Sequence, residues 1–146
     1  FISSTFWTER IGPTAALKSL EIMEREKSWE RITYLGNYMR RIWKETALKN
    51  NIEIEINGLI PVSTYYFKHE DNLKFKTYLS QEFLKKEFLA STNFYSSTAH
   101  NERILDDYSE ILEEIYFTIK ECINNKKNID DLLETSLCHT GFKRLN

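Results

Sequence analysis

The sequence predicts an α+β fold, in which a small antiparallel sheet of about three strands carries long helices packed on one face. The first observation is that the strand-like segments lie close together along the chain, without the regular helical crossovers that parallel strands need. The second is that long segments with apolar residues every three or four positions precede and follow them. The third is size, because 146 residues with 41% hydrophobic content are enough for one domain with a core of its own.

Two helices are expected in the first third of the chain. The first begins near Pro13, a residue favoured in the first turn of a helix, and runs to about Lys27. The second begins at Ser28, which we expect to be its N-cap, and ends at Asn50 and Asn51. The apolar positions at helical spacing are Leu17, Leu20 and Met23 in the first helix, and Trp29, Ile32, Leu35, Met39 and Ile42 in the second, with Trp43 and Ala47 widening that stripe.

Two further long helices and one short helix are expected later in the chain. The long ones span about Asn72 to Phe88 and about Asn101 to Asn124. Asn128 is expected to cap the short one. The inward-facing positions are predicted to be Phe75, Tyr78, Leu79, Phe83 and Leu84 in the earlier helix, and Ile104, Tyr108, Ile111, Ile115 and Ile119 in the later one.

Three strands are expected between these helices. In Ile52–Ile56, isoleucines alternate with glutamates, the pattern of a strand with one wet face. Asn57-Gly58 predicts a turn after it. The β-branched and aromatic run Leu59–Phe67 predicts the second strand, and Pro61 places its start at an edge or outside the ladder. Leu89–Asn93 is expected to be a third, short strand.

Charge and composition exclude several classes of function. The net charge of −2 gives no general attraction to nucleic acid, and we expect neither a nucleic-acid partner nor a membrane partner, because no apolar run reaches the length of a bilayer span. Cys122 and Cys138 are too few and too far apart for a disulfide framework, so reduced thiols in a cytoplasmic protein are expected. We assign no metal, because His69, His100 and His139 lack metal-ligand spacing.

Three passages then resemble a known family. The passage SSTFWTERIGPTAAL, Ser3–Leu17, resembles the cofactor-proximal turn of class III aminotransferases, which are fold-type-I pyridoxal-phosphate (PLP) enzymes, and above all their glutamate-1-semialdehyde 2,1-aminomutase branch. FYSSTAHNERILDDYSEIL, Phe94–Leu112, resembles that branch's passage into its last long helix, and CHTGFKRLN, Cys138–Asn146, a tail in its relatives. The resemblance implies that residues 1–27 are the cofactor-turn segment and linking helix from the large domain, and that residues 28–146 are the small C-terminal domain.

The resemblance assigns a cofactor role to the first residues of the chain. Phe1–Trp7 is expected to be extended and to lead into a turn. In the family, a threonine at this place lies at the dimer interface and binds the phosphate of the other subunit's PLP, which implies Thr5 as the cofactor-binding residue with Ser4 beside it. Hydroxyls and free backbone N–H groups suit a phosphate, because they donate several short hydrogen bonds without bulk. Thr8 is an alternative, and a local hydrogen bond to the backbone is the structural alternative for Thr5.

Two residues of the second passage bear on the reaction. His100 is expected to be a structural residue at the start of a helix, hydrogen-bonded locally, rather than a general base. Some aminomutases of the branch have a glutamate eight residues before this histidine, near the substrate. Thr92 occupies that place here, which leaves both transamination and the mutase reaction open.

The resemblance also implies a component that the chain does not contain. PLP chemistry needs a lysine that forms a Schiff base and later moves a proton. In the family this lysine precedes the turn, whereas the first lysine here is Lys18. We therefore expect the C-terminal part of a homodimeric PLP enzyme that acts on a small-molecule amino donor and a carbonyl acceptor, and that is inactive without its large domain. The alternative is a non-catalytic interaction or scaffold domain, with Trp29, Trp43 and Tyr116 binding a partner.

Overall fold

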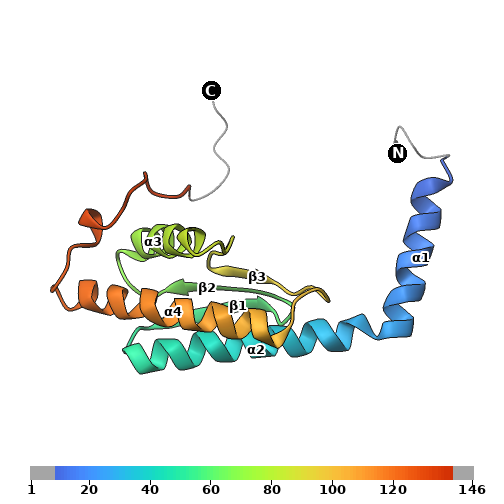
Figure 1. Cartoon of the computed structure of the whole chain (residues 1–146), viewed down its shortest axis with the longest axis horizontal. Coiled ribbons are helices and arrows are strands. Elements are labelled where there is room, and N and C mark those ends of the chain that lie inside the picture. Colours follow the sequence, from blue (N-terminus) through green and yellow to red (C-terminus); the bar gives the residue numbers. More distant parts are fainter. Residues whose placement is uncertain (1–8, 140–146) are drawn as a thin grey trace.

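The computed structural model describes residues 9–139 as an α+β fold, which confirms the predicted class. A three-stranded antiparallel sheet packs against long helices, while the first helix projects away from this body (Figure 1). The elements are α1 (Ile11–Glu26), α2 (Ser28–Asn50), β1 (Ile54–Leu59), β2 (Val62–Phe67), α3 (Asn72–Lys85), β3 (Asn93–Tyr95), α4 (Glu102–Ile123) and the 3₁₀ helix η1 (Ile129–Asp131).

The β1–β2 hairpin closes three residues later than the sequence predicts. Leu59 pairs with Val62, so the connection is Ile60-Pro61, and the turn expected at Asn57-Gly58 is wrong. Gly58 lies inside β1 with φ 85°, in the left-handed region that glycine adopts without strain. Pro61 lies outside the ladder, as expected, because it cannot donate a ladder hydrogen bond.

The third strand also differs from the prediction. β3 spans Asn93–Tyr95 and pairs with Val62–Thr64 of β2, so the strand predicted at Leu89–Asn93 begins four residues too early. Leu89 is 98% exposed. α3 ends at Lys85, where Glu87 adopts a left-handed conformation and the Phe88 N–H donates to the Phe83 carbonyl. The segment after this helix end is a connection, and the chain joins the sheet only at Asn93.

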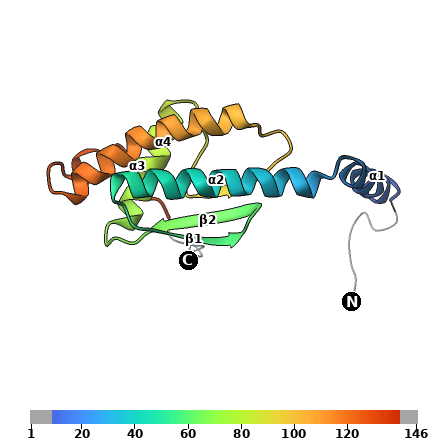
Figure 2. The same cartoon turned by 90° about the horizontal axis from the view of Figure 1, so that it is seen from below.

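One face of the sheet carries the core. Along β2 the side chains of Ser63, Tyr65 and Phe67 are buried, whereas the alternate side chains are exposed. The helices lie on the buried face of the sheet, and no described helix covers the other face (Figure 2). Tyr65 and Phe67 join buried aromatic rings from the helices, and Phe83 stacks on Tyr108 with centroids 4.5 Å apart.

The buried stripes of the helices match the prediction in part. The buried apolar residues of α2 are Leu35, Met39, Ile42, Trp43 and Ala47, those of α3 are Phe75, Tyr78, Leu79 and Phe83, and those of α4 are Leu105, Tyr108, Leu112, Ile115, Tyr116 and Ile119. Leu84 was expected to face inward and is exposed, and Trp29, the first apolar position of the stripe predicted in α2, is exposed as well. In α4, Tyr108, Ile115 and Ile119 are buried as predicted, but Leu105 and Leu112 are buried in place of the expected Ile104 and Ile111.

The first two helices meet at a sharp bend. Lys27 adopts the left-handed conformation with φ 49° and ψ 47°, and α2 begins directly after it. Ser28 is therefore not the N-cap that its residue type predicts, and its hydroxyl instead donates to the Met23 carbonyl of α1 at 3.5 Å. None of the α1 residues is buried, and Leu17 and Leu20 are 64% and 59% exposed.

Asparagine side chains cap α4 and η1, and the cap predicted at Asn128 is confirmed. Asn101 accepts a hydrogen bond from the Ile104 N–H at the start of α4, and Asn128 accepts one from the Asp130 N–H at the start of η1. Within residues 9–139, no helix has the length and apolar content of a bilayer span.

Candidate functional site

The predicted cofactor-binding residues precede the described part of the chain. Thr5, Ser4 and the alternative Thr8 lie outside residues 9–139. The described chain next to them is the start of α1, where Arg10 is the N-cap position and provides no side-chain capping bond. The first turn of α1 contains no acidic residue, and Pro13 lies within it. Within residues 9–139 no side chain caps the N-terminal end of α1, and its first backbone N–H groups and the positive end of the helix dipole suit an anion.

The second family-like passage connects β3 to α4 and is held by local hydrogen bonds. The Ser97 N–H donates to His100 Nδ1 at 3.1 Å, and the His100 N–H donates to the Ser97 carbonyl at 3.1 Å. The His100 ring lies 5.1 Å from the ring of Phe94. These bonds confirm the structural role predicted for His100. With Nδ1 occupied as an acceptor, the neutral ring carries its proton on Nε2.

Thr92 lies at the end of the sheet. It is 4% exposed, and its carbonyl accepts hydrogen bonds from the Tyr65 N–H at 2.9 Å and the Thr64 hydroxyl at 3.1 Å. Thr92 is thus a buried backbone anchor of the sheet.

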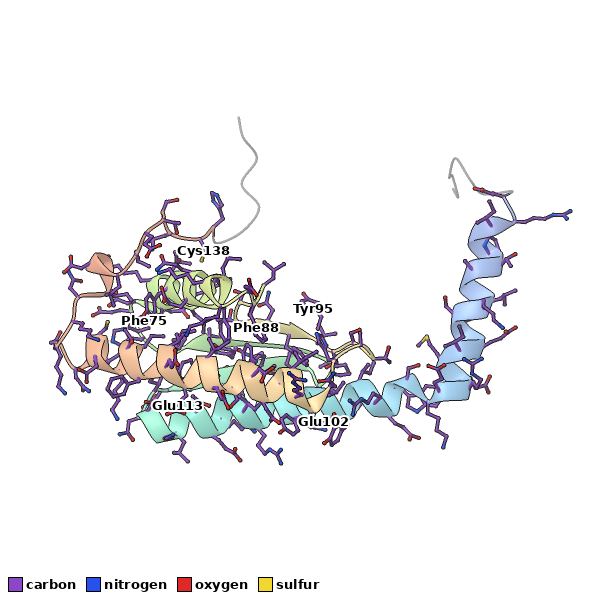
Figure 3. The ribbon with its side chains drawn as sticks, in the orientation of Figure 1. Phe75, Phe88, Tyr95, Glu102, Glu113 and Cys138 are labelled. Atoms are coloured by element: carbon purple, nitrogen blue, oxygen red, sulfur yellow. The ribbon has the colours of Figure 1, made fainter. Side chains whose placement is uncertain are left out.

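An ion pair that the sequence did not reveal fixes the start of α4 to α2. Arg31 donates from Nη1 and Nη2 to the two carboxylate oxygens of Glu102, at 2.7 and 3.0 Å, and from Nη2 to the His100 carbonyl at 3.3 Å. Figure 3 shows Glu102 where α4 begins, beside α2. The Arg31 hydrogen bond lowers the pKa of Glu102 to about 2. The two residues are 71 positions apart, so only the fold brings them together.

A half-open hollow of about 270 Å³ lies beside this connection. Met39, Trp43 and Tyr108 are buried in its wall, and Trp43 Nε1 donates to the Tyr108 hydroxyl at 3.0 Å. Burial raises the pKa of Tyr108, so this hydroxyl stays neutral. Phe94 and His100 line the hollow from the β3 side. The hollow could not be predicted from the sequence, because its walls come from segments far apart in the chain.

Three of the described lysines, Lys18, Lys74 and Lys85, form ion pairs that do not suit a Schiff-base lysine. Such an amine must lose its proton near neutral pH, which requires a lowered pKa. Lys74 has a raised pKa because Asp130 accepts its hydrogen bond, and Glu134 raises the pKa of Lys85 in the same way. Lys18 is exposed on α1 and pairs with Glu21 at 2.8 Å. The start of α1 thus fits the phosphate of PLP, but these three amines do not fit its aldehyde.

The described residues also lack a metal-like cluster. Between Glu9 and His139, no group of three or more histidine, cysteine, aspartate or glutamate side chains could hold a metal ion. Cys122 and Cys138 are free thiols.

Comparison with known proteins gives one informative result. No family model and no curated protein matches this sequence. Among solved structures, the FumI protein of Sphingopyxis sp. MTA144, in its PLP internal aldimine form, has a similar fold with a TM-score of 0.72 and 17% sequence identity. The match covers 91% of this chain and 33% of the FumI chain. The chain therefore has the fold of about one third of FumI.

Proposed function

We propose that this chain is the C-terminal portion of a PLP-dependent class III transaminase or aminomutase that transfers an amino group from a small-molecule donor to a carbonyl compound. The observation that carries the proposal is the fold shared with FumI, which extends over 91% of this chain at a TM-score of 0.72. FumI is itself a PLP protein by its bound form. The motif resemblance of Ser3–Leu17 and Phe94–Leu112 supports the same family independently of the fold.

In this proposal the first residues hold the cofactor of a neighbouring subunit. Thr5, with Ser4 beside it, donates hydrogen bonds to the phosphate of PLP across a homodimer interface. The uncapped start of α1 adds the attraction of its helix dipole, supported by the absence of an acidic residue in its first turn. When bound, PLP supplies an electron sink for bonds at the amino-bearing carbon. The reactive lysine and the acid that pairs with the pyridinium nitrogen belong to the large domain of the parent protein.

The structure weakens the alternative of a non-catalytic scaffold domain. That alternative used Trp29, Trp43 and Tyr116 as a partner-binding surface. Trp43 and Tyr116 are fully buried and hold the core together, so only Trp29, 46% exposed, is available to a partner. The break at Lys27 supports a division into residues 1–27, which belong with the large domain, and residues 28–146 as the small domain.

The proposal is tested by trapping PLP with borohydride on this chain and on the full-length protein that contains it. We expect a stoichiometric adduct at one lysine of the large domain, and none at any lysine of this chain tested by itself. Pyridoxal without its phosphate is the control for unspecific labelling of exposed amines such as Lys18. A stoichiometric adduct at a single lysine of this chain, with turnover of an amino donor, would contradict the proposal.

A further inference from the structure

Among residues 9–139, no strand pairs with the outer edge of β3, whose backbone hydrogen-bonding groups point away from β2. The sheet order is β1-β2-β3, so no fourth strand formed by residues 9–139 pairs with β3. The Tyr65 N–H donates to the Thr92 carbonyl, and the Ser96 N–H donates to the Pro61 carbonyl, so the even-numbered residues of this segment face β2. In an antiparallel ladder the alternate residues face the other way. The N–H and C=O groups of Asn93 and Tyr95 therefore point outward.

The hollow of about 270 Å³ lies next to this edge, on the helix side of the sheet. Asn93, Phe94 and Tyr95 line it together with the chain that leads into β3, including Leu89 and Ala90. Figure 3 shows Phe88 and Tyr95 at this end of the sheet. Leu89 is 98% exposed and Tyr95 is 66% exposed. No aspartate, glutamate, lysine or arginine lines the hollow, so the site is suited to an uncharged ligand.

The edge and the hollow are placed so that one ligand can use both. Residues directly opposite each other in neighbouring strands point their side chains to the same face. Phe94 points its side chain to the helix face, where it is 9% exposed. A residue placed opposite Phe94 on an added strand would therefore point into the hollow. Its two neighbours would lie opposite Asn93 and Tyr95, whose outward N–H and C=O groups can pair with them.

We propose that the β3 edge binds an extended, uncharged peptide segment of another polypeptide as a fourth antiparallel strand, with one aliphatic or aromatic side chain inserted into the hollow. Main-chain pairing supplies the affinity and the hollow supplies the specificity, as in other cases of strand addition to a sheet edge. An apolar cavity of about 150 Å³ holds a benzene ring, so this hollow has room for a leucine or phenylalanine side chain. The inference does not depend on the proposed function, because it uses neither PLP nor the first residues of the chain.

The probe is the peptide acetyl-Thr-Ser-Leu-Ser-Thr-amide, titrated into the isotope-labelled chain and followed by backbone amide NMR. We expect saturable shifts at Asn93 and Tyr95 and on residues that line the hollow. Leucine replaced by aspartate should weaken binding at least tenfold. N-methylation of either serine should do the same, because those N–H groups face β3. N-methylation of the leucine should leave binding nearly unchanged, because its N–H faces away.

Protein variants test the same contacts from the other side. Tyr95→Pro removes an outward N–H without removing a bond to β2, and Ala90→Phe fills the hollow; each should weaken binding at least tenfold, whereas Tyr95→Phe should not. If Tyr95→Pro or Ala90→Phe does not fold, the N-methylated peptides still test strand pairing at β3 with the unaltered protein. Binding that ignores the position of methylation, or no saturable shift at Asn93 and Tyr95, would overturn the proposal. So would light scattering that shows a dimer which Tyr95→Pro dissociates, because the occupant would then be a second copy.

Discussion

Gly36 is the residue of α2 at which the packing against the β1–β2 hairpin leaves no room for a side chain. A Cβ atom added there would overlap the carbonyl oxygen of Ile60 and lie 2.7 Å from its carbonyl carbon. Backbone cannot move aside as a flexible side chain can. The absence of a side chain thus lets the helix approach the Ile60-Pro61 connection, near which Arg40 also donates to Ser63 Oγ at 2.6 Å.

Gly36→Ala is expected to destabilise the protein although alanine favours helices. The gain in helix propensity is about 1 kcal/mol, and forcing extra volume into a packed site costs about 1–3 kcal/mol, with a clash against backbone at the upper end. We expect the free energy of unfolding, measured in urea, to fall by about 2 kcal/mol. The matched control is Gly12→Ala in α1, where nothing lies within 4 Å of the added Cβ. Equal stability of Gly36→Ala and the wild type would refute the close packing.

Glu102 is expected to make stability depend on acid pH. Its pKa in the folded protein is lowered to about 2, mainly by the Arg31 hydrogen bond. Folding therefore favours the ionised form of Glu102 over the protonated form. The stabilisation is therefore complete above the ordinary pKa of a glutamate and is lost as the pH falls towards 2. Urea unfolding between pH 6 and pH 2 should show a decline that Glu102→Gln reduces and that the control Glu24→Gln, on exposed α1, retains. The same slope in all three proteins would count against the ion pair.

Among the helices, α1 is the one whose residues are not buried by the rest of the described chain. It has 16 residues, none of them buried, and helices of this length are marginal in water without tertiary packing. Its leucines lie on the surface instead of in a core. In the proposed parent protein, the large domain covers them.

Hydrogen exchange tests this difference between α1 and α2. In the isolated chain, the amides of residues 15–26 should exchange at nearly unprotected rates, whereas those of residues 35–47 should exchange only with global unfolding. Leu20→Ser should leave the free energy of unfolding almost unchanged, and Leu35→Ala, a fully buried position, should lower it by about 2–5 kcal/mol. Strong protection of α1 in the isolated monomer would show that α1 is stable without any partner.

Elements were predicted well where periodicity was long, and poorly where it was short. The ends of the four long helices were predicted to within three residues, because apolar spacing defines the helices and asparagines at positions 51 and 101 mark two of the ends. β3 was misplaced because three residues carry too little pattern, and the apolar Leu89 belongs to an exposed connection. Asn57-Gly58 predicts a turn by residue type, but the chain uses the glycine's positive φ inside the strand.

At the scale of the whole molecule, the fold class could be predicted from the order of the segments, but the site could not be built from them. The Arg31–Glu102 pair, the hollow beside β3 and the Trp43–Tyr108 hydrogen bond each join residues at least 60 positions apart. Periodicity gives which side of a helix is buried only to within one position, as α4 shows. Such long-range contacts depend on which side of each helix faces the sheet. No local sequence pattern gives that orientation closely enough to place the contacts.

We propose that Thr5 holds the phosphate group of PLP in a larger enzyme that shares this fold with FumI. The most direct measurement is a crystal structure of the full-length protein with PLP bound, in which the distance from the Thr5 hydroxyl to the nearest phosphate oxygen is read. We expect a hydrogen bond of about 2.5–3.0 Å, from the subunit that does not hold the reactive lysine. A Thr5 hydroxyl that contacts only its own backbone, with the phosphate bound entirely by other residues, would contradict it.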